Sequence, residues 1–374
     1  MKVNYSGYFD ALSGMGEACR NIIKALYLSG VELTTELVPN ISGKINLGSA
    51  YDIASSLQGK FNDYNVKIIH ITPDMIIRHL DPTKYHIFHL FWETDRLSKW
   101  WVWCLNLVDE IWTGDERQAQ IFRDSGVKKY VWVCPQPIDT SIININPMEF
   151  SENEQPVKFD FIFYSIFQWI ERKDPKSLLT AYWQEFQNKE NVCLILKTYI
   201  EKYTPDEIVR IKMEIEKWKK ELNFDYYPPV YLSGDSLDRK DILRFHSAGD
   251  CFVLSHRGEG WGIPLAEAML MGKPIISTKL GGIHQYLDDE LAYLVGYDMV
   301  NVFNMDWVPW YEKDQKWAQI NIKEFREKMR YVFENKDKAK TIGNSAQKFV
   351  LDNFNYLAIG NKMKDRLQAI AKEI

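Results

Sequence analysis

The 374-residue chain lacks the long apolar segments that mark membrane and secreted proteins. No run reaches the roughly 18 apolar residues that a membrane-spanning helix requires. The N-terminal segment, MKVNYSGYFDALSGMGEACR, also lacks the apolar stretch of a signal peptide. We therefore expect a cytoplasmic protein with no spanning helix. This composition does not exclude weak peripheral contact with a membrane through a local patch.

Cysteine is scarce, and its spacing argues against disulfides and metal fingers. The five cysteines are Cys19, Cys104, Cys134, Cys193 and Cys251. Their number is odd, they are widely spaced, and none forms a Cys-x-x-Cys pair. We therefore expect reduced thiols and no metal site.

The chain also lacks a basic arm. It has 46 basic and 51 acidic residues, a net charge of −5, and this argues against nucleic acid as a partner. Aromatic residues are plentiful at 14%. They serve hydrophobic cores as well as sugar-binding surfaces, and we assign most of them to cores.

Short apolar runs alternate with helical stretches, which predicts α/β domains with parallel sheets covered on both faces. In the first half the strands are expected at residues 2–5, 31–38, 66–71, 85–91, 110–113 and 130–134, and the clearest helices at 16–28, 100–107 and 116–125. In the second half the strands are expected at 159–164, 192–197, 230–233, 251–254 and 274–277, and helices at 175–186, 206–222, 239–248, 264–271 and from 322 onward.

The length suits two domains better than one core. A polar stretch with two prolines, residues 139–157, interrupts the alternation and is interpreted as a linker. We expect a first domain at residues 1–150, a second at 157–349, and a helix at about 350–374 that packs back on the first. Two doubly wound Rossmann-like domains would then face each other across a cleft, with ligands at the carboxyl ends of the strands.

The most informative segment is CFVLSHRGEGWGIPLAEAMLMGKPIIST, residues 251–278. A strand leads through a glycine-rich loop into a helix that begins near Pro264. Glycine lets the backbone approach a ligand, and the start of a helix favours a phosphate, so Gly262, Ile263 and Pro264 are candidates for donor binding. Glu259 and Glu267 lie before and within the helix. The alternative is a helix whose acidic residues only complement its dipole.

This segment resembles the glutamate-x7-glutamate motif of glycosyltransferase family 4, whose members have the GT-B fold. The resemblance implies that Glu267 binds the ribose hydroxyls of a nucleotide donor. It implies that Glu259 lies beside the donor sugar and the reacting centre. It further implies transfer with retention of anomeric configuration, without a bound metal or another cofactor.

A basic pair, Arg172 and Lys173, follows the first strand of the second domain in FYSIFQWIERKDP. A diphosphate leaving group gains negative charge as its bond breaks, and these two cations are suited to stabilise it. Lys173 matches the lysine of the family pattern. The arginine that usually precedes it is replaced by Phe167 or Gln168, and Arg172 is the candidate to supply the second cation.

Near the N-terminus, Gly14 and Gly16 are expected in a loop that approaches phosphate or sugar. The full G-x-G-x-x-G fingerprint with its later acidic residue is absent, which argues against a nicotinamide dehydrogenase. A plain turn is the alternative.

The stretch HLFWETDRLSKW resembles a WETDRLP-type segment of one branch of the same family. It should face the cleft from the first domain, which makes Trp92, Glu93 and Thr94 candidates for contact with the acceptor or the donor sugar. His70 and His89 end neighbouring strands and are further candidates, although a lone histidine is more often structural.

Together these features predict a retaining transferase that moves a hexose from a UDP- or GDP-sugar to a hydroxyl of a glycan, a lipid-linked acceptor or a small molecule. The alternatives are another GT-B enzyme, such as a sugar-nucleotide epimerase or a phosphorylase, and a protein that binds sugar nucleotides without catalysis.

Overall fold

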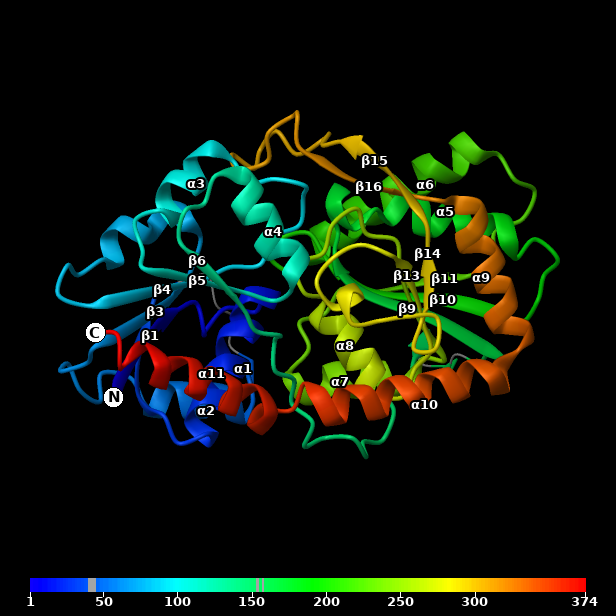
Figure 1. Ribbon diagram of the computed structural model, residues 1–374. Coiled ribbons are helices and arrows are strands. Elements are labelled where there is room, and N and C mark those ends of the chain that lie inside the picture. The colour runs from blue at the N-terminus through cyan, green and yellow to red at the C-terminus, as the bar shows by residue number, and fades with distance from the viewer. Residues whose placement is uncertain (40–44, 153–154, 157) are drawn as a thin grey trace.

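The computed structural model describes residues 1–39, 45–152, 155–156 and 158–374. Two lobes, each built around a six-stranded sheet, lie side by side (Figure 1). The segment interpreted as a linker, residues 139–157, connects them. Its residues 153, 154 and 157 lie outside the described residues, and a short pairing of Ser151–Glu152 (β7) with Gln155–Pro156 (β8) flanks the first two.

The first lobe is a parallel sheet in the strand order β2-β1-β3-β4-β5-β6. Its strands are β1 (Lys2–Gly7), β2 (Glu32–Leu37), β3 (Val66–His70), β4 (Tyr85–His89), β5 (Glu110–Thr113) and β6 (Tyr130–Val133). Its helices are α1 (Gly14–Leu28), α2 (Ser49–Ser56), α3 (Lys99–Leu105) and α4 (Glu116–Ser125), with a 3-10 helix η1 (Pro73–His79). Every residue of β3 is buried, as expected for a strand covered on both faces.

Local signals set the helix limits in this lobe. Ser13 caps α1 by accepting a hydrogen bond from the amide of Gly16, and Asp115 caps α4 in the same way at Gln118. Gly126 ends α4 in the left-handed conformation, φ 104°, which glycine adopts readily.

The second lobe has the same architecture, with the parallel strand order β11-β10-β9-β12-β13-β14. Its strands are β9 (Phe161–Gln168), β10 (Val192–Tyr199), β11 (Val230–Ser233), β12 (Cys251–Leu254), β13 (Ile275–Thr278) and β14 (Tyr293–Val295). Its helices include α5 (Pro175–Glu185), α6 (Pro205–Leu222), α7 (Arg239–Ala248) and α8 (Ile263–Leu270), with 3-10 helices η2 (Glu171–Lys173) and η3 (Ile283–Gln285). The expected parallel α/β sheets are confirmed, and β14 is an addition that the sequence analysis missed.

A second addition is an antiparallel arm, residues 297–320, formed by β15 (Tyr297–Asn301), β16 (Lys316–Ile320) and the loop between them. It crosses the top of the molecule in Figure 1 toward α3 of the first lobe. There Trp310 stacks on Trp101, with ring centroids 5.2 Å apart, and the Arg96 guanidinium donates to Glu312 at 2.8 Å. The arm therefore ties the second lobe to the first.

The C-terminal helices divide between the lobes. α9 (Ile322–Glu334) and α10 (Lys336–Asn353) cover the second lobe, whereas α11 (Tyr356–Ile370) lies along α1 of the first lobe (Figure 1). The Tyr356 hydroxyl donates to the Asn21 side chain at 2.7 Å. The chain thus crosses between lobes twice, and the crossings touch, because the amide of Ile138 donates to the carbonyl of Phe354 at 2.7 Å.

No helix within the described ranges combines the length and the apolarity needed to cross a bilayer. The five cysteines are all buried and free.

Candidate active site

A cavity of about 390 Å³ lies between the lobes. It is lined from the first lobe by the start of α1 and the ends of β3 and β4, and from the second lobe by the ends of β9 and β10 and the start of α8. This is the carboxyl edge of both sheets, where ligands of doubly wound folds bind.

The glycine-rich loop between β12 and α8 forms one wall of the cavity. Gly262 caps α8 in the left-handed conformation, φ 92°, and Gly262, Ile263 and Pro264 all line the cavity. Pro264 has no amide hydrogen, so the first free N–H groups at this helix start are those of Gly262 and Ile263. A helix start with free amides is suited to an anionic group.

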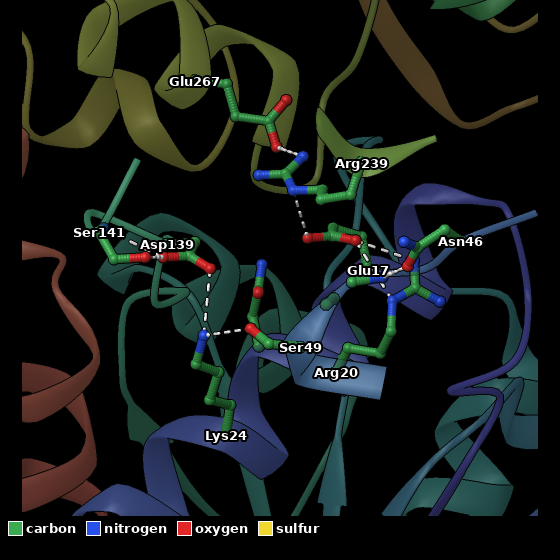
Figure 2. Close-up of polar contacts among 12 residues, drawn as sticks. Glu17, Arg20, Lys24, Asn46, Ser49, Asp139, Ser141, Arg239 and Glu267 are labelled. Carbon is green, nitrogen blue, oxygen red and sulfur yellow. Dashed lines mark hydrogen bonds and ion pairs between the residues drawn. The ribbon is translucent and has the colours of Figure 1, made fainter. Parts of the chain in front are cut away.

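Glu267 lies on α8, is only 2% exposed and contacts two side chains of α7, Arg239 and His246. Figure 2 shows the contact with Arg239. Arg239 Nη1 donates to Glu267 Oε1 at 2.5 Å, and His246 Nε2 lies 3.3 Å from Oε2. Burial opposes ionisation, but the charge of Arg239 and the contact with His246 lower the pKa of Glu267 below its usual value. A carboxylate has about four acceptor sites, so ionised Glu267 keeps capacity for ligand hydroxyls.

Arg239 extends this network across the cleft. Its Nε lies 3.4 Å from Glu17 Oε1 on α1, and Glu17 also accepts a hydrogen bond from Arg20 Nη2 at 2.8 Å (Figure 2). The amide of Arg239 donates to the carbonyl of Asn46 at 3.3 Å. The two lobes are therefore joined by charge directly beside Glu267.

Glu259 and Lys173 form an ion pair inside the cavity, and both side chains are 12% exposed. Burial would raise the pKa of Glu259, but the charges of Lys173 and Arg172 lower it below its usual value. Burial lowers the pKa of Lys173, and Glu259 partly opposes this effect. The pair places a carboxylate and an ammonium together at the loop that precedes α8.

Arg172 is directed differently from Lys173. Its Nη1 donates to the carbonyl of Gly258 at 2.8 Å, and its Nη2 lies 3.7 Å from the Glu93 carboxylate of the first lobe. Burial works against the charge, but Glu93 is the main group that raises the pKa of Arg172. Arg172 thus supports the loop and bridges the cleft as it lines the cavity.

Two glycines of this loop allow the lobes to come close. A Cβ on Gly258 would lie 2.4 Å from the Glu93 carbonyl oxygen, and one on Gly260 would lie 2.9 Å from the Phe91 Cβ. The Gln118 side chain of the first lobe also donates to the carbonyl of Gly260 at 2.7 Å. Gly260 lines the cavity and also permits the close approach of the other lobe.

The first lobe contributes His70 and Glu93 to the cavity wall. The Tyr5 hydroxyl and His70 Nδ1 lie 2.6 Å apart, and burial lowers the pKa of His70 to about 3, so its ring is neutral at pH 7. His89 lies behind it, with ring centroids 4.5 Å apart. Neither ring nitrogen of His89 has a hydrogen-bond partner among the described residues.

His89 does not line the cavity, and neither do three further candidates of the first lobe. Trp92 is 1% exposed, packs against Trp101 and donates to the carbonyl of Arg96 at 2.8 Å. The Thr94 hydroxyl donates to the same carbonyl at 2.9 Å. These two shape the segment around Glu93. Gly16 packs against Ala11, whose carbonyl oxygen would lie 2.1 Å from an added Cβ.

Gly14 does line the cavity, but as the first residue of α1 and not as part of a loop. The sequence analysis also missed several wall residues: Glu17, Phe91, Lys197, Tyr199, Tyr203 and Arg239. Lys197 ends a predicted strand, Tyr199 follows it closely and Arg239 begins a predicted helix, so their positions at the carboxyl edge were an available signal.

Comparison with known proteins agrees with this geometry. Residues 160–303 match the family model described as Glycosyl transferases group 1. Trehalose synthase from Thermococcus litoralis is 26% identical over 140 residues, which are 37% of this chain and 28% of that protein. Trehalose synthase from Pyrococcus horikoshii is 32% identical over 81 residues, 21% of this chain and 20% of that protein. The match thus spans less than a third of these relatives.

Solved structures match the chain along its whole length. Sucrose-phosphate synthase from Thermosynechococcus elongatus superimposes with a TM-score of 0.70 at 14% identity, covering 100% of both chains. Anabaena HepE, in complex with UDP and glucose, gives 0.66 at 17% identity, covering 98% of this chain and 99% of that one. The fold is GT-B, which confirms the expected fold class. The family model, over residues 160–303, supports a glycosyltransferase.

Proposed function

We propose that this protein is a retaining hexosyltransferase of glycosyltransferase family 4 that uses a nucleotide-diphosphate sugar. The observation that carries the proposal is the cavity between the lobes, where the ion pair of Glu259 and Lys173 lies beside the start of α8 and Glu267 lies further along that helix. This arrangement offers acceptors for hydroxyl groups and donors for phosphate in one enclosed space.

In the proposed reaction, Glu267 accepts hydrogen bonds from the ribose hydroxyls. The amides at Gly262 and Ile263 and the ammonium of Lys173 face the diphosphate. Negative charge moves to the diphosphate as the anomeric bond stretches, and a fixed cation stabilises that charge best in an enclosed site. Glu259 is beside the donor sugar, and no metal is required in this scheme.

The acceptor hydroxyl would attack from the face that the diphosphate leaves, and the leaving phosphate would take its proton. This course retains the anomeric configuration and needs no strong side-chain base. His70 supports the scheme because its neutral ring can donate to or accept from a sugar hydroxyl. Glu93, held by Arg172, is the second candidate on the acceptor side.

For the donor we propose a UDP-hexose before a GDP-hexose, because the structural neighbour HepE was solved with UDP and with UDP-glucose. The acceptor is a hydroxyl of a glycan, a lipid-linked molecule or a small molecule. A cytoplasmic location is part of the proposal, and five free, buried thiols fit a reducing compartment. Weak peripheral membrane contact is also part of it, supported by the half-exposed, stacked indoles of Trp100 and Trp103 on α3.

The first test is a thermal-shift screen with UDP-, GDP- and ADP-sugars, because a ligand that binds only the folded state raises the melting temperature. Incubation of the stabilising donor with a panel of acceptors should then release the nucleoside diphosphate. The anomeric configuration of the product, read by NMR, decides between retention and inversion.

The same assays separate the alternatives. An epimerase or a phosphorylase would convert its substrate without acceptor-dependent release of nucleoside diphosphate. A protein that only binds sugar nucleotides would show the thermal shift and no turnover with any acceptor. An inverted product would overturn the proposed reaction course.

A further inference from the structure

Lys197 is a buried cation in the cavity without an anionic partner. It lies near the carboxyl end of β10, lines the cavity and is 3% exposed. Its Nζ makes no hydrogen bond or ion pair with any residue that the structure describes. It lies instead 4.6 Å from the ring centroid of Tyr203 and 5.9 Å from that of Tyr199.

The other basic side chains of the cavity wall are already engaged. Each of them pairs with a carboxylate: Arg20 with Glu17, Arg172 with Glu93, Lys173 with Glu259, and Arg239 with Glu17 and Glu267. Lys197 differs from all of them, because its charge is met only by the faces of two aromatic rings. Cation–π contacts contribute less than burial of an ammonium group costs.

Lys197 lies on the strand next to the one that lacks the expected arginine. Phe167 and Gln168 stand where an arginine was expected before Lys173. The Phe167 ring stacks on Trp169, and the Gln168 side chain donates to the carbonyl of Ile200 at 2.8 Å. On the adjacent strand, Lys197 pairs with Ile166, which also lines the cavity.

We propose that Lys197 binds a phosphate oxygen of the donor's diphosphate and is the second cation, with Lys173, that holds this group. The inference rests on the proposed function and names the residue that takes the place of the missing arginine. An ammonium buried without a counter-ion becomes favourable once an anion enters the cavity. Tyr199 and Tyr203, whose ring centroids lie 4.1 Å apart, hold the ammonium group in place before the anion arrives.

The electrostatics of the surroundings agree with this role. Burial lowers the pKa of Lys197 to about 8, and Asp235, on the loop after β11, opposes the shift from a distance. Burial raises the pKa values of Tyr199 and Tyr203, so both rings are neutral and neither supplies a counter-charge. A bound phosphate would favour the protonated lysine, so binding should be accompanied by proton uptake near pH 8.

The test compares the wild-type chain with Lys197→Met and Lys197→Arg, using UDP, inorganic pyrophosphate and uridine as probes in calorimetric titrations. We expect Lys197→Met to weaken UDP and pyrophosphate at least tenfold and to leave uridine within twofold. Lys197→Arg should recover most of the loss. Lys176→Met is the matched control, because Lys176 is an exposed lysine of α5 that pairs with Glu221 outside the cavity.

A second measurement uses pH. From pH 7 to 9.5 the UDP affinity of the wild-type chain should fall more steeply than that of Lys197→Arg, because arginine stays charged. Lys173 is present in both proteins and cancels in the comparison. Melting curves establish that each variant is folded, and Lys197→Gln serves as a second neutral variant.

The outcomes separate this inference from the proposed function. If the wild-type chain binds neither pyrophosphate nor any of UDP, GDP and ADP, the proposed function fails. If the wild-type chain binds UDP and Lys197→Met binds it equally well, only the role of Lys197 is overturned. If Lys197→Met loses affinity for uridine and UDP equally, Lys197 contacts the nucleoside and the proposed phosphate contact is overturned.

Discussion

Arg239 joins Glu267 of its own lobe to Glu17 of the other lobe, with nitrogen–oxygen distances of 2.5 and 3.4 Å (Figure 2). All three side chains are largely buried, so none of these charges is fully screened by water. One guanidinium therefore orients the carboxylate assigned to the ribose and also holds the cleft closed.

These two roles can be separated by mutation. We expect Arg239→Met to weaken UDP binding more than tenfold, because Glu267 loses its main counter-charge. Glu17→Gln should increase the radius of gyration in solution scattering, because the link between lobes weakens, and should change UDP affinity by less than threefold. Arg244→Met is the control on the same helix, since Arg244 pairs with Asp241 at a more exposed position. Equal effects of Arg239→Met and Arg244→Met on UDP affinity would contradict the first role.

Replacement of Glu267 should affect both binding and folding. Glu267→Ala leaves Arg239 and His246 without their carboxylate, and removal of one member of a buried pair costs about 3–5 kcal/mol. Glu267→Gln keeps the shape and one acceptor oxygen, so it should be less destabilising but should still weaken UDP at least tenfold. Denaturant titration and calorimetry measure the two effects. Donor affinity that is unaffected in the folded Gln variant would remove the ribose assignment.

Lys173→Met should lower kcat by about 10²–10³, the effect typical of losing one donor to a developing charge. The variant should also move the acid limb of the pH–rate profile to higher pH. The reason is that Lys173 helps to lower the pKa of Glu259, and burial, which raises it, would then prevail. Rate profiles from pH 4 to 9 measure this shift. A variant with the wild-type rate and acid limb would exclude Lys173 from the reacting centre.

Acid should destabilise the fold through buried histidines. Burial lowers the pKa of His284 to about 4 although Glu259 opposes the shift, and burial lowers that of His70 to about 3. The unfolded chain, with histidine pKa values near 6.5, binds more protons below that pH, so the free energy of unfolding falls as pH falls from 6.5 toward 4. His284→Gln should remove about 2 kcal/mol of the loss between pH 6.5 and 5, a pKa unit being about 1.36 kcal/mol. Denaturant titrations at several pH values test this, and an unchanged slope in the variant would refute it.

Mutations in the arm test whether its contacts with the first lobe hold the arm in place. Trp310→Ala removes the stack on Trp101, and Arg96→Ala removes the ion pairs to Glu312 and Asp314. Hydrogen exchange should then accelerate in the loop of the arm, whereas the β10 and β12 amides keep their protection. Lys313→Ala is the control, because Lys313 is exposed and pairs with Asp306 of the same loop. Faster exchange throughout both sheets would show a global loss of stability instead.

The sequence predicts the repeating elements of this fold well and the contacts between lobes poorly. Strands such as β5, β11 and β12 each contain a short apolar run with clear ends, and their limits were predicted at the observed residues. The arm was missed because β15 alternates weakly and contains Asp298, and its partner strand is only recognisable once the two are paired.

In the candidate active site, too, the residues within local sequence patterns were predicted and those defined by contacts in the fold were not. Glu259, Glu267 and Lys173 lie in a continuous strand–loop–helix pattern, which local sequence reveals. Arg239 meets Glu17, a group distant in sequence, and no local pattern encodes this contact. Lys197 is close in sequence to the Tyr203 ring that it meets, but only the fold places both residues in the cavity wall. Trp92 and Thr94 were predicted to contact a ligand, but their side chains point away from the cavity and stabilise the segment that carries Glu93.

The contact between Ile138 and Phe354 has a mechanical consequence. Two crossings that touch at one place allow the lobes to rotate about that place and oppose their separation there. A cut in residues 139–157 would divide the chain into two fragments, but α11 of the C-terminal fragment would still pack along α1 of the first lobe, so both halves should stay associated after a single proteolytic nick.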